Sequence, residues 1–171
     1  TGPGGGGKSR LALEVAHDVL NNAPDETGAL SGEVWFADLG PVDEPEQVAS
    51  AVAAAMGIPT LPGEDVSIAV ATSLSTRQGL LVLDTCEHVV AGAASLVSQV
   101  LRAARDVEVL ATSRRPLGVN GEIAWPVPPL AAAPPDITSV ADALSYPAVA
   151  LFADRATAVH PDFVIADTDL S

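Results

Sequence analysis

The sequence predicts an α/β fold in which a doubly wound, mainly parallel sheet carries helices on its faces. Segments with the composition of strands alternate with segments of helical periodicity along the 171 residues. One of them, residues 79–84 (Gly-Leu-Leu-Val-Leu-Asp), holds four consecutive aliphatic residues without polar alternation. Such a run is typical of a strand that is buried on both faces, as in a parallel sheet.

The first turn of the chain, residues 2–9 (Gly-Pro-Gly-Gly-Gly-Gly-Lys-Ser), matches the phosphate-binding pattern G-x-x-x-x-G-K-[ST] in full. Glycines let backbone N–H groups turn toward a phosphate without a Cβ in the way. Lys8 carries a compact charge that can reach the β- and γ-phosphates, and the Ser9 hydroxyl can ligate a hydrated Mg²⁺. The motif therefore predicts a P-loop NTPase fold and a nucleotide site.

A flexible Gly/Ser linker is the alternative interpretation of this stretch. The Lys-Ser pair at the required offset, followed at once by a helical pattern over residues 10–20, favours the phosphate loop. A loop of this kind follows a buried strand. Because the sequence starts at Thr1, we expect that first strand to lie in a longer protein, outside this chain.

The remaining elements follow from periodicity and from turn residues. Strands are expected at residues 33–39, 79–84, 107–113 and 123–127. Helices are expected at residues 44–56, 65–75, 88–105 and 147–159. Asp43 and Glu46 predict a capping box at the start of the first of these helices, and Gly57 predicts its end. Trp35 and Trp125 are expected in the core, and Cys86 as a packed thiol.

The charge balance limits the partners of this chain. Twenty-two acidic and eight basic residues give a formal net charge of −14. A surface this negative repels the phosphates of nucleic acids and anionic membranes, so we expect neither as a direct partner. No apolar run is long enough to span a bilayer, and the single cysteine fits a reducing, cytoplasmic compartment.

Two polar positions, Asp84 and Arg114, should meet the loop at the carboxyl edge of the sheet, where ligands of such sheets bind, and Glu87 is the nearest candidate to act on a water. Asp84 ends the aliphatic strand and can hold Mg²⁺ beside the loop hydroxyl, although many strands end in Asp as a turn former. Arg114 follows the next strand and can stabilise a γ-phosphate, or it is a surface arginine. Glu87 can polarise an attacking water, or it is a carboxylate favoured by a helix start.

Four motifs in order resemble the STAND class of signalling ATPases, especially the nucleotide-binding domain of large bacterial transcriptional regulators of the LuxR and antibiotic-regulatory types. The NB-ARC domains are related. The motifs are Thr-Gly-Pro-Gly-Gly-x-Gly-Lys-Ser-Arg-Leu-Ala, Leu-Leu-Val-Leu-Asp-x-Cys-Glu-His, Leu-Ala-Thr-Ser-Arg-x-Pro-Leu-Gly-Val and Trp-x-Val-Pro-Pro-Leu. The resemblance spans residues 1–130 and reappears at 148–159.

The resemblance implies ATP or ADP with Mg²⁺ and nucleotide-controlled release of attached domains. It implies residues 2–9 as Walker A, Asp84 as Walker B, Arg114 as phosphate sensor and Pro128 beside adenine. The implied catalytic residues are Lys8, Asp84, Glu87 and Arg114, and the implied metal ligands are Ser9 and Asp84. The implied nucleotide contacts are Gly2, Pro3, Gly4, Gly5, Gly6, Gly7, Lys8, Ser9, Arg10 and Pro128.

The expected organisation is a nucleotide-binding domain at residues 1–130, an Ala/Pro-rich linker at 131–146 and the start of a helical lid domain at 147–171. The resemblance implies sensor, effector and DNA-binding domains elsewhere in the same polypeptide, and nucleotide-dependent oligomers as one form. A slow switch ATPase is the first hypothesis. A small P-loop kinase is another, and Thr85, where the family usually has Asn or Asp, supports a scaffold without turnover.

Overall fold

A computed structural model describes residues 1–21 and 32–166 of the chain. Residues 21–32, whose polar and turn-forming composition predicts a connecting loop, lie mostly outside the described residues. The chain divides into two compact units, Thr1–Val127 and Pro128–Ser171.

The first unit is built on a parallel sheet of three strands in the order β1-β2-β3. These strands are β1 (Glu33–Asp38), β2 (Gly79–Asp84) and β3 (Val107–Ala111). Their register aligns Asp38 with Asp84 and Leu83 with Ala111, so the carboxyl ends of all three strands share one edge. Strand β2 is buried along its whole length, which confirms the strand predicted from its run of aliphatic residues.

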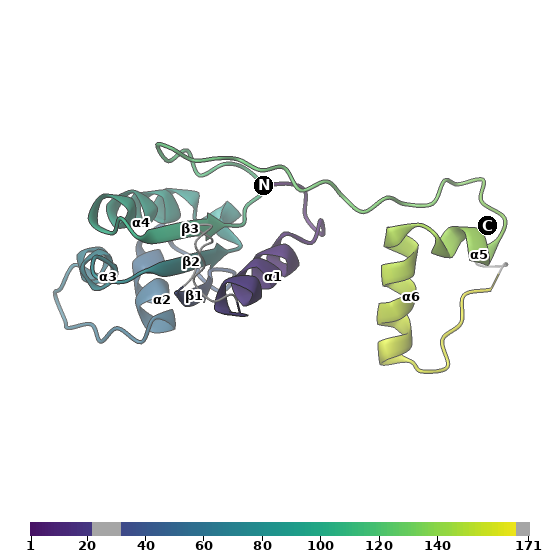
Figure 1. Cartoon of the computed structure of the whole chain (residues 1–171), viewed down its shortest axis with the longest axis horizontal. Coiled ribbons are helices and arrows are strands. Elements are labelled where there is room, and N and C mark those ends of the chain that lie inside the picture. Colours follow the sequence, from purple (N-terminus) through teal and green to yellow (C-terminus); the bar gives the residue numbers. More distant parts are fainter. Residues whose placement is uncertain (22–31, 167–171) are drawn as a thin grey trace. The chain divides into compact units, whose positions relative to one another are not determined.

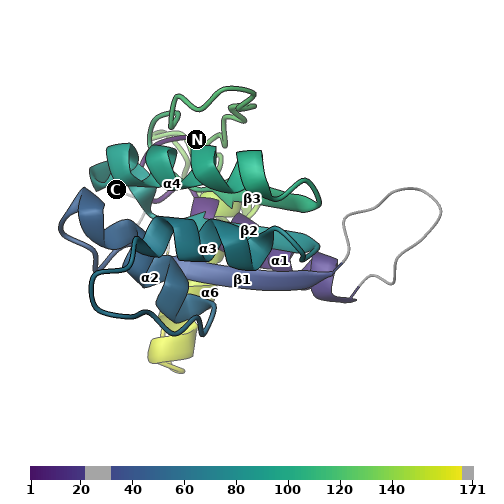
Figure 2. The ribbon, with the colours of Figure 1, turned by 90° about the vertical axis from the view of Figure 1, so that its left-hand side faces the viewer.

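Helices cover both faces of this sheet (Figure 1). Helix α1 (Lys8–Asn21) packs alone on one face, against Leu80 and Val82 of β2. The opposite face carries α2 (Val48–Ala55), α3 (Val66–Leu74) and α4 (Val90–Ala103), which lie in front of the strands in Figure 2. Alternate residues of β2 therefore enter two separate apolar clusters, as a strand buried on both faces requires.

Helix boundaries follow the predictions closely, with one correction. Helix α3 lies within the predicted range 65–75, and Asp65 is its N-cap, whose carboxylate accepts hydrogen bonds from the N–H groups of Ser67 and Ile68. The predicted capping box of Asp43 and Glu46 is wrong. A 3₁₀ turn, η1 (Pro45–Gln47), leads into α2 there without a side-chain cap. Proline fixes the φ of that first turn and so favours entry without a capping side chain.

The strand predicted at residues 123–127 is absent, and this segment has no regular structure. Trp125, expected in the core, is 73% exposed, whereas Trp35 is buried as predicted. The sequence pattern at residues 123–127 suits a strand, but a strand also needs a neighbour to complete its backbone hydrogen bonds. Within the described part of the chain, no strand pairs with this segment.

The second unit contains α5 (Val140–Leu144) and α6 (Pro147–Val159), the latter as predicted. Helix α5 lies within the stretch expected to be a linker. Phe152 and Phe163 meet edge to face, with ring centroids 5.8 Å apart. Among the described residues, no helix is long and apolar enough to cross a membrane.

Candidate functional site

The glycine-rich loop turns sharply and runs directly into α1. Gly5 and Gly7 have φ angles of 75° and 78°, in the left-handed region that favours glycine. The Gly7 carbonyl accepts the first helical hydrogen bond, from Leu11 N at 2.9 Å. The free N–H groups at the start of a helix attract anions, so the loop presents a phosphate-sized target at the N-terminus of α1.

The Lys8 ammonium folds back over this loop. Its Nζ donates a hydrogen bond to the Pro3 carbonyl at 2.8 Å. The positive charge is therefore held at the loop rather than extended into solvent. A compact ammonium in this place can exchange its carbonyl partner for a phosphate oxygen.

Asp84 is held at the carboxyl end of β2 by two threonines. The Thr112 hydroxyl donates to Asp84 Oδ1, and the Thr85 hydroxyl donates to Oδ2 at 3.4 Å. The Thr112 hydroxyl also accepts a bond from Thr85 N at 2.9 Å. Asp84 is 7% exposed, so these bonds fix a nearly buried carboxylate in one orientation.

Thr85 has φ 63° and ψ 51°, a left-handed conformation that a β-branched residue rarely adopts. Strained backbone of this kind persists where the surrounding structure imposes it, and it is common at functional sites. No sequence pattern predicts this conformation. Thr112 was predicted only as part of the strand at residues 107–113, so its role in orienting Asp84 was missed.

Arg114 joins Glu87 to the glycine-rich loop. Its Nε donates to Glu87 Oε1 at 3.0 Å, and a Cβ built on Gly4 would lie 3.8 Å from its Nη2. The guanidinium thus lies beside the loop, and its role as a phosphate sensor stays a prediction. Glu87 belongs to the 3₁₀ turn η2 (Cys86–His88) that follows β2. Its carboxylate is occupied by Arg114 and would have to leave it to polarise a water.

An open depression of about 550 Å³ lies at this edge. It is lined by Gly40, Thr85, Glu87, His88, Arg114 and Arg115. His88 is fixed there by a 2.7 Å hydrogen bond between its Nε2 and the Val42 carbonyl. The structure therefore gathers Glu87 and Arg114 around one hollow, beside the strand end that bears Asp84.

The other predicted residues have different surroundings. Ser9 lies in the first turn of α1 and makes no hydrogen bond to Asp84 in the described part of the chain. Arg10 pairs with Glu14 on the outside of α1 at 2.7 Å. Pro128 is the first residue of the second unit and stays a prediction as an adenine contact. No cluster of three or more His, Cys, Asp or Glu side chains that could hold a metal ion occurs among the described residues.

Cys86 is a packed thiol, as predicted. Burial, together with the nearby negative charges of Asp84 and Glu87, raises the pKa of this thiol to about 12. Its Sγ donates to the Leu83 carbonyl at 3.4 Å. A thiol that stays protonated at neutral pH is a poor nucleophile.

This shift in pKa predicts a loss of stability at alkaline pH. The unfolded thiol loses its proton near pH 9.0 and the folded one near pH 12, so deprotonation favours the unfolded chain between these values. The contribution of the protonated Cys86 thiol to the free energy of unfolding is thus fully present below pH 9.0 and declines toward pH 12. Urea unfolding at pH 8, 9 and 10 measures it, as the difference between the wild type and Cys86→Ala. A difference that does not change over this range contradicts the assignment.

Comparison with known proteins finds bacterial relatives of much greater length. The chain is 39% identical over 166 residues to a protein of Mycobacterium tuberculosis named "Putative HTH-type transcriptional regulator". The match covers 97% of this chain and 16% of that relative, and a Mycobacterium bovis protein of the same description matches equally. An uncharacterized protein of Mycobacterium tuberculosis is 34% identical over 169 residues, which are 98% of this chain and 38% of the relative. No family model matches the chain, and no solved structure matches it significantly.

Proposed function

We propose that this chain is the nucleotide-binding switch domain of a transcriptional regulator, that it holds ATP or ADP with Mg²⁺, and that it hydrolyses ATP slowly. The observation that carries the proposal is the meeting of a glycine-rich, helix-opening loop with Arg114 beside Gly4. The names of the relatives are consistent with a regulatory role. A nucleotide that binds one conformation of the regulator better than another would shift the population of active molecules.

The residues present suit a magnesium nucleotide. The loop leaves room for phosphate oxygens because no side chain projects from Gly4, Gly5, Gly6 or Gly7, and a Cβ on Gly5 or Gly7 would meet no atom within 4 Å. Lys8 would contact the β- and γ-phosphates. Ser9 and Asp84 would supply oxygen ligands to Mg²⁺, which keeps most of its remaining shell as water and phosphate oxygen.

In this proposal each residue has a distinct task. Bound Mg²⁺ would neutralise charge on the phosphates. Arg114 would stabilise the γ-phosphate, and its Nη2 already lies beside the loop at Gly4. The Glu87 carboxylate would accept a proton from water only after leaving its ion pair with Arg114. This prior engagement of Glu87 would make turnover slow.

A nucleotide-binding scaffold without turnover is the second candidate. It is favoured by Thr85, whose neutral hydroxyl donates a hydrogen bond to Asp84. It is also favoured by the engagement of Glu87 with Arg114. The two candidates share the nucleotide and differ in phosphate release.

Substitution of Asp84 by Asn tests the proposal. We expect the rate of phosphate release to fall about 100-fold, because the carboxylate that holds Mg²⁺ is lost, whereas Mg²⁺-free ADP affinity stays unchanged. Asp106→Asn is a matched control. This exposed carboxylate directly precedes β3, at the edge of the sheet opposite Asp84, so its loss should leave both measurements unaltered.

Calorimetric titration with Mg-ATP and Mg-ADP, together with a phosphate-release assay, provides the readout. Binding without any phosphate release supports the scaffold. Absence of binding to either nucleotide by the folded protein rejects both candidates.

A further inference from the structure

The carboxyl edge of the sheet carries a second carboxylate next to Asp84. Asp38 is the last residue of β1, and the strand register aligns it with Asp84, the last residue of β2. Neighbouring strands lie about 4.8 Å apart, and side chains that are in register on them project from the same face of the sheet. Asp38 and Asp84 are therefore adjacent side chains on one face.

Both carboxylates lie on the face of the sheet that carries α1. Side chains alternate between the two faces along a strand, so Asp38 shares its face with Phe36, and Asp84 shares its face with Val82. Phe36 and Val82 both belong to the apolar cluster that packs against α1. Helix α1 begins at Lys8, directly after the glycine-rich loop. Asp38 therefore lies on the side of the sheet where the loop opens its helix.

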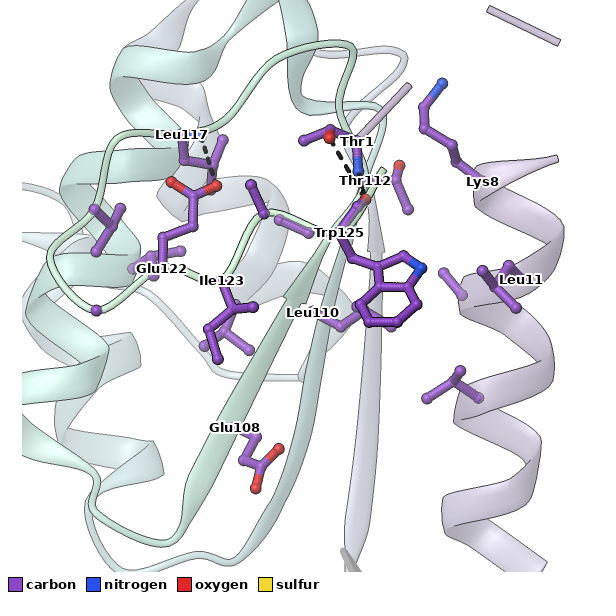
Figure 3. Close-up of a pocket in the computed structure, with 18 of the residues that line it drawn as sticks. Thr1, Lys8, Leu11, Glu108, Leu110, Thr112, Leu117, Glu122, Ile123 and Trp125 are labelled. Carbon is purple, nitrogen blue, oxygen red and sulfur yellow. Dashed lines mark hydrogen bonds between the residues drawn. The ribbon is translucent and has the colours of Figure 1, made fainter. Parts of the chain in front are cut away.

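The row of side chains at this edge continues toward the loop. Thr112 follows β3 and is the next neighbour of Asp84, to which its hydroxyl donates a hydrogen bond. Thr112 and Lys8 in turn line one cavity between β3 and α1 (Figure 3). The side chains of Asp38, Asp84 and Thr112 thus form a row of oxygen atoms that leads from β1 toward the loop.

The backbone after β1 fixes Asp38 in this row. Leu39 N donates to the Asp84 carbonyl at 2.9 Å, so the pairing of β1 with β2 extends past both carboxylates. Gly40 N donates to Asp38 Oδ1 at 2.8 Å, which leaves Oδ2 without a hydrogen-bond partner in the described part of the chain. Gly40 also lines the depression around Arg114. One carboxylate oxygen of Asp38 is therefore available close to the candidate site.

No basic side chain balances the charges of Asp38 and Asp84. Among the described residues, neither carboxylate forms an ion pair with a lysine or an arginine. Two like charges side by side on neighbouring strands destabilise a sheet. Asp84 is only 7% exposed, so solvent screens its charge poorly. A bound cation would offset this repulsion, and a magnesium nucleotide brings one.

We propose that Asp38 is a positioning residue of the nucleotide site, whose carboxylate accepts hydrogen bonds from the water molecules that Mg²⁺ retains beside Asp84. This inference rests on the proposed function and adds one residue to it. Mg²⁺ binds through one or two carboxylates and keeps several waters, which need acceptors. Acceptors of this kind orient the direct ligands, and their loss typically weakens metal binding about 10- to 100-fold.

A purely structural role is the alternative for Asp38. An aspartate that accepts the N–H two residues further on is a common turn former, and Gly40 N makes that bond. Asparagine forms the same turn with its carbonyl oxygen but carries no charge. Glutamate keeps the charge, but its longer side chain does not suit the turn. These two substitutions therefore separate the two roles.

Titration of Mn²⁺ into the protein saturated with ADP provides the test. Mn²⁺ prefers the same oxygen ligands as Mg²⁺, and its free concentration is measured by EPR. We expect Asp38→Asn to weaken Mn²⁺ binding about tenfold, and Asp38→Glu to bind Mn²⁺ more tightly than Asp38→Asn. The affinity for ADP in EDTA should be equal in all variants, because Asp38 does not contact the nucleotide. Asp106→Asn, the matched control, removes one exposed charge beside β3 and should bind Mn²⁺ like the wild type.

Equal Mn²⁺ affinity of Asp38→Asn and Asp106→Asn overturns the proposal. A greater loss of Mn²⁺ affinity in Asp38→Glu than in Asp38→Asn also overturns it, since that order indicates the turn. In either case, binding of ADP and Mn²⁺ by the wild type leaves the proposed function standing. Absence of ADP binding by the folded wild type rejects the proposed function itself, and this inference with it.

The stability of the nucleotide-free protein gives an independent readout. Without metal or ADP, Asp38→Asn should raise the urea midpoint, because one of two adjacent charges is removed and the turn is kept. Salt at about 1 M should reduce this gain, because it screens the repulsion. Asp106→Asn should change the midpoint little. A midpoint of Asp38→Asn at or below that of the wild type overturns the repulsion on which the proposal depends.

Discussion

Replacement of Lys8 by Ala is expected to weaken the binding of Mg-ATP about 100-fold. Hydrogen bonds to a charged group contribute about 1.5–3 kcal/mol, and the ammonium is the cation that the loop itself supplies to the phosphates. In the structure this ammonium already lies over the loop, 2.8 Å from the Pro3 carbonyl. Binding therefore requires a change of partner rather than a rearrangement of the side chain.

Isothermal titration of Lys8→Ala with Mg-ATP measures this loss. Arg102→Ala removes the same unit of charge from the exposed end of α4 and should bind like the wild type. The thermal midpoint of nucleotide-free Lys8→Ala should stay near that of the wild type, since Lys8 makes a single exposed contact. Equal affinity of the two variants would contradict a phosphate role for the loop.

Replacement of Gly92 by Ala is expected to destabilise the first unit by about 3 kcal/mol, at the upper end of the usual effect of overpacking. The sign is unusual, because alanine normally stabilises a helix relative to glycine. Gly92 lies in α4 where this helix meets η1, and a Cβ there would collide with the Pro45 carbonyl. The Pro45 carbonyl belongs to the backbone, so it cannot move aside as easily as the end of a flexible side chain.

Urea unfolding compares this variant with Ala91→Ser. That control adds one atom at the neighbouring, exposed position of the same helix and should change the free energy of unfolding by less than about 0.5 kcal/mol. A higher free energy of unfolding for Gly92→Ala than for the wild type would mean that Gly92 does not lie against the Pro45 carbonyl.

Much of the fold was accessible to sequence reasoning, for physical reasons. Strand β2 and helix α6 have the predicted boundaries because an unbroken aliphatic run and a first-turn proline are local signals. The strand at residues 123–127 was wrong because its formation depends on a neighbour, which no local pattern reveals. Trp125 was misplaced for the same reason.

The candidate site divides in a similar way. The sequence motif identified the loop. Asp84 was predicted at the carboxyl edge of a parallel sheet, and the register of the strands places it there. The hydrogen bond from Thr112 to Asp84 joins side chains 28 positions apart in the sequence. The left-handed backbone conformation of Thr85 is imposed by the surrounding fold. Neither has a sequence signature. The engagement of Arg114 by Glu87 was also unforeseen, although each residue had been selected separately.

The open edge of β3 also has a bearing on how this chain behaves in concentrated solution. Unpaired strand edges recruit other chains and seed aggregation unless a charge or a kink protects them. Glu108 is an exposed carboxylate near the start of this short strand, in a chain with a net charge of −14. This carboxylate opposes pairing of two β3 edges, since two chains that approached in this way would bring two negative charges together. The chain should therefore precipitate near its isoelectric point of about 4.2, where this repulsion is lost.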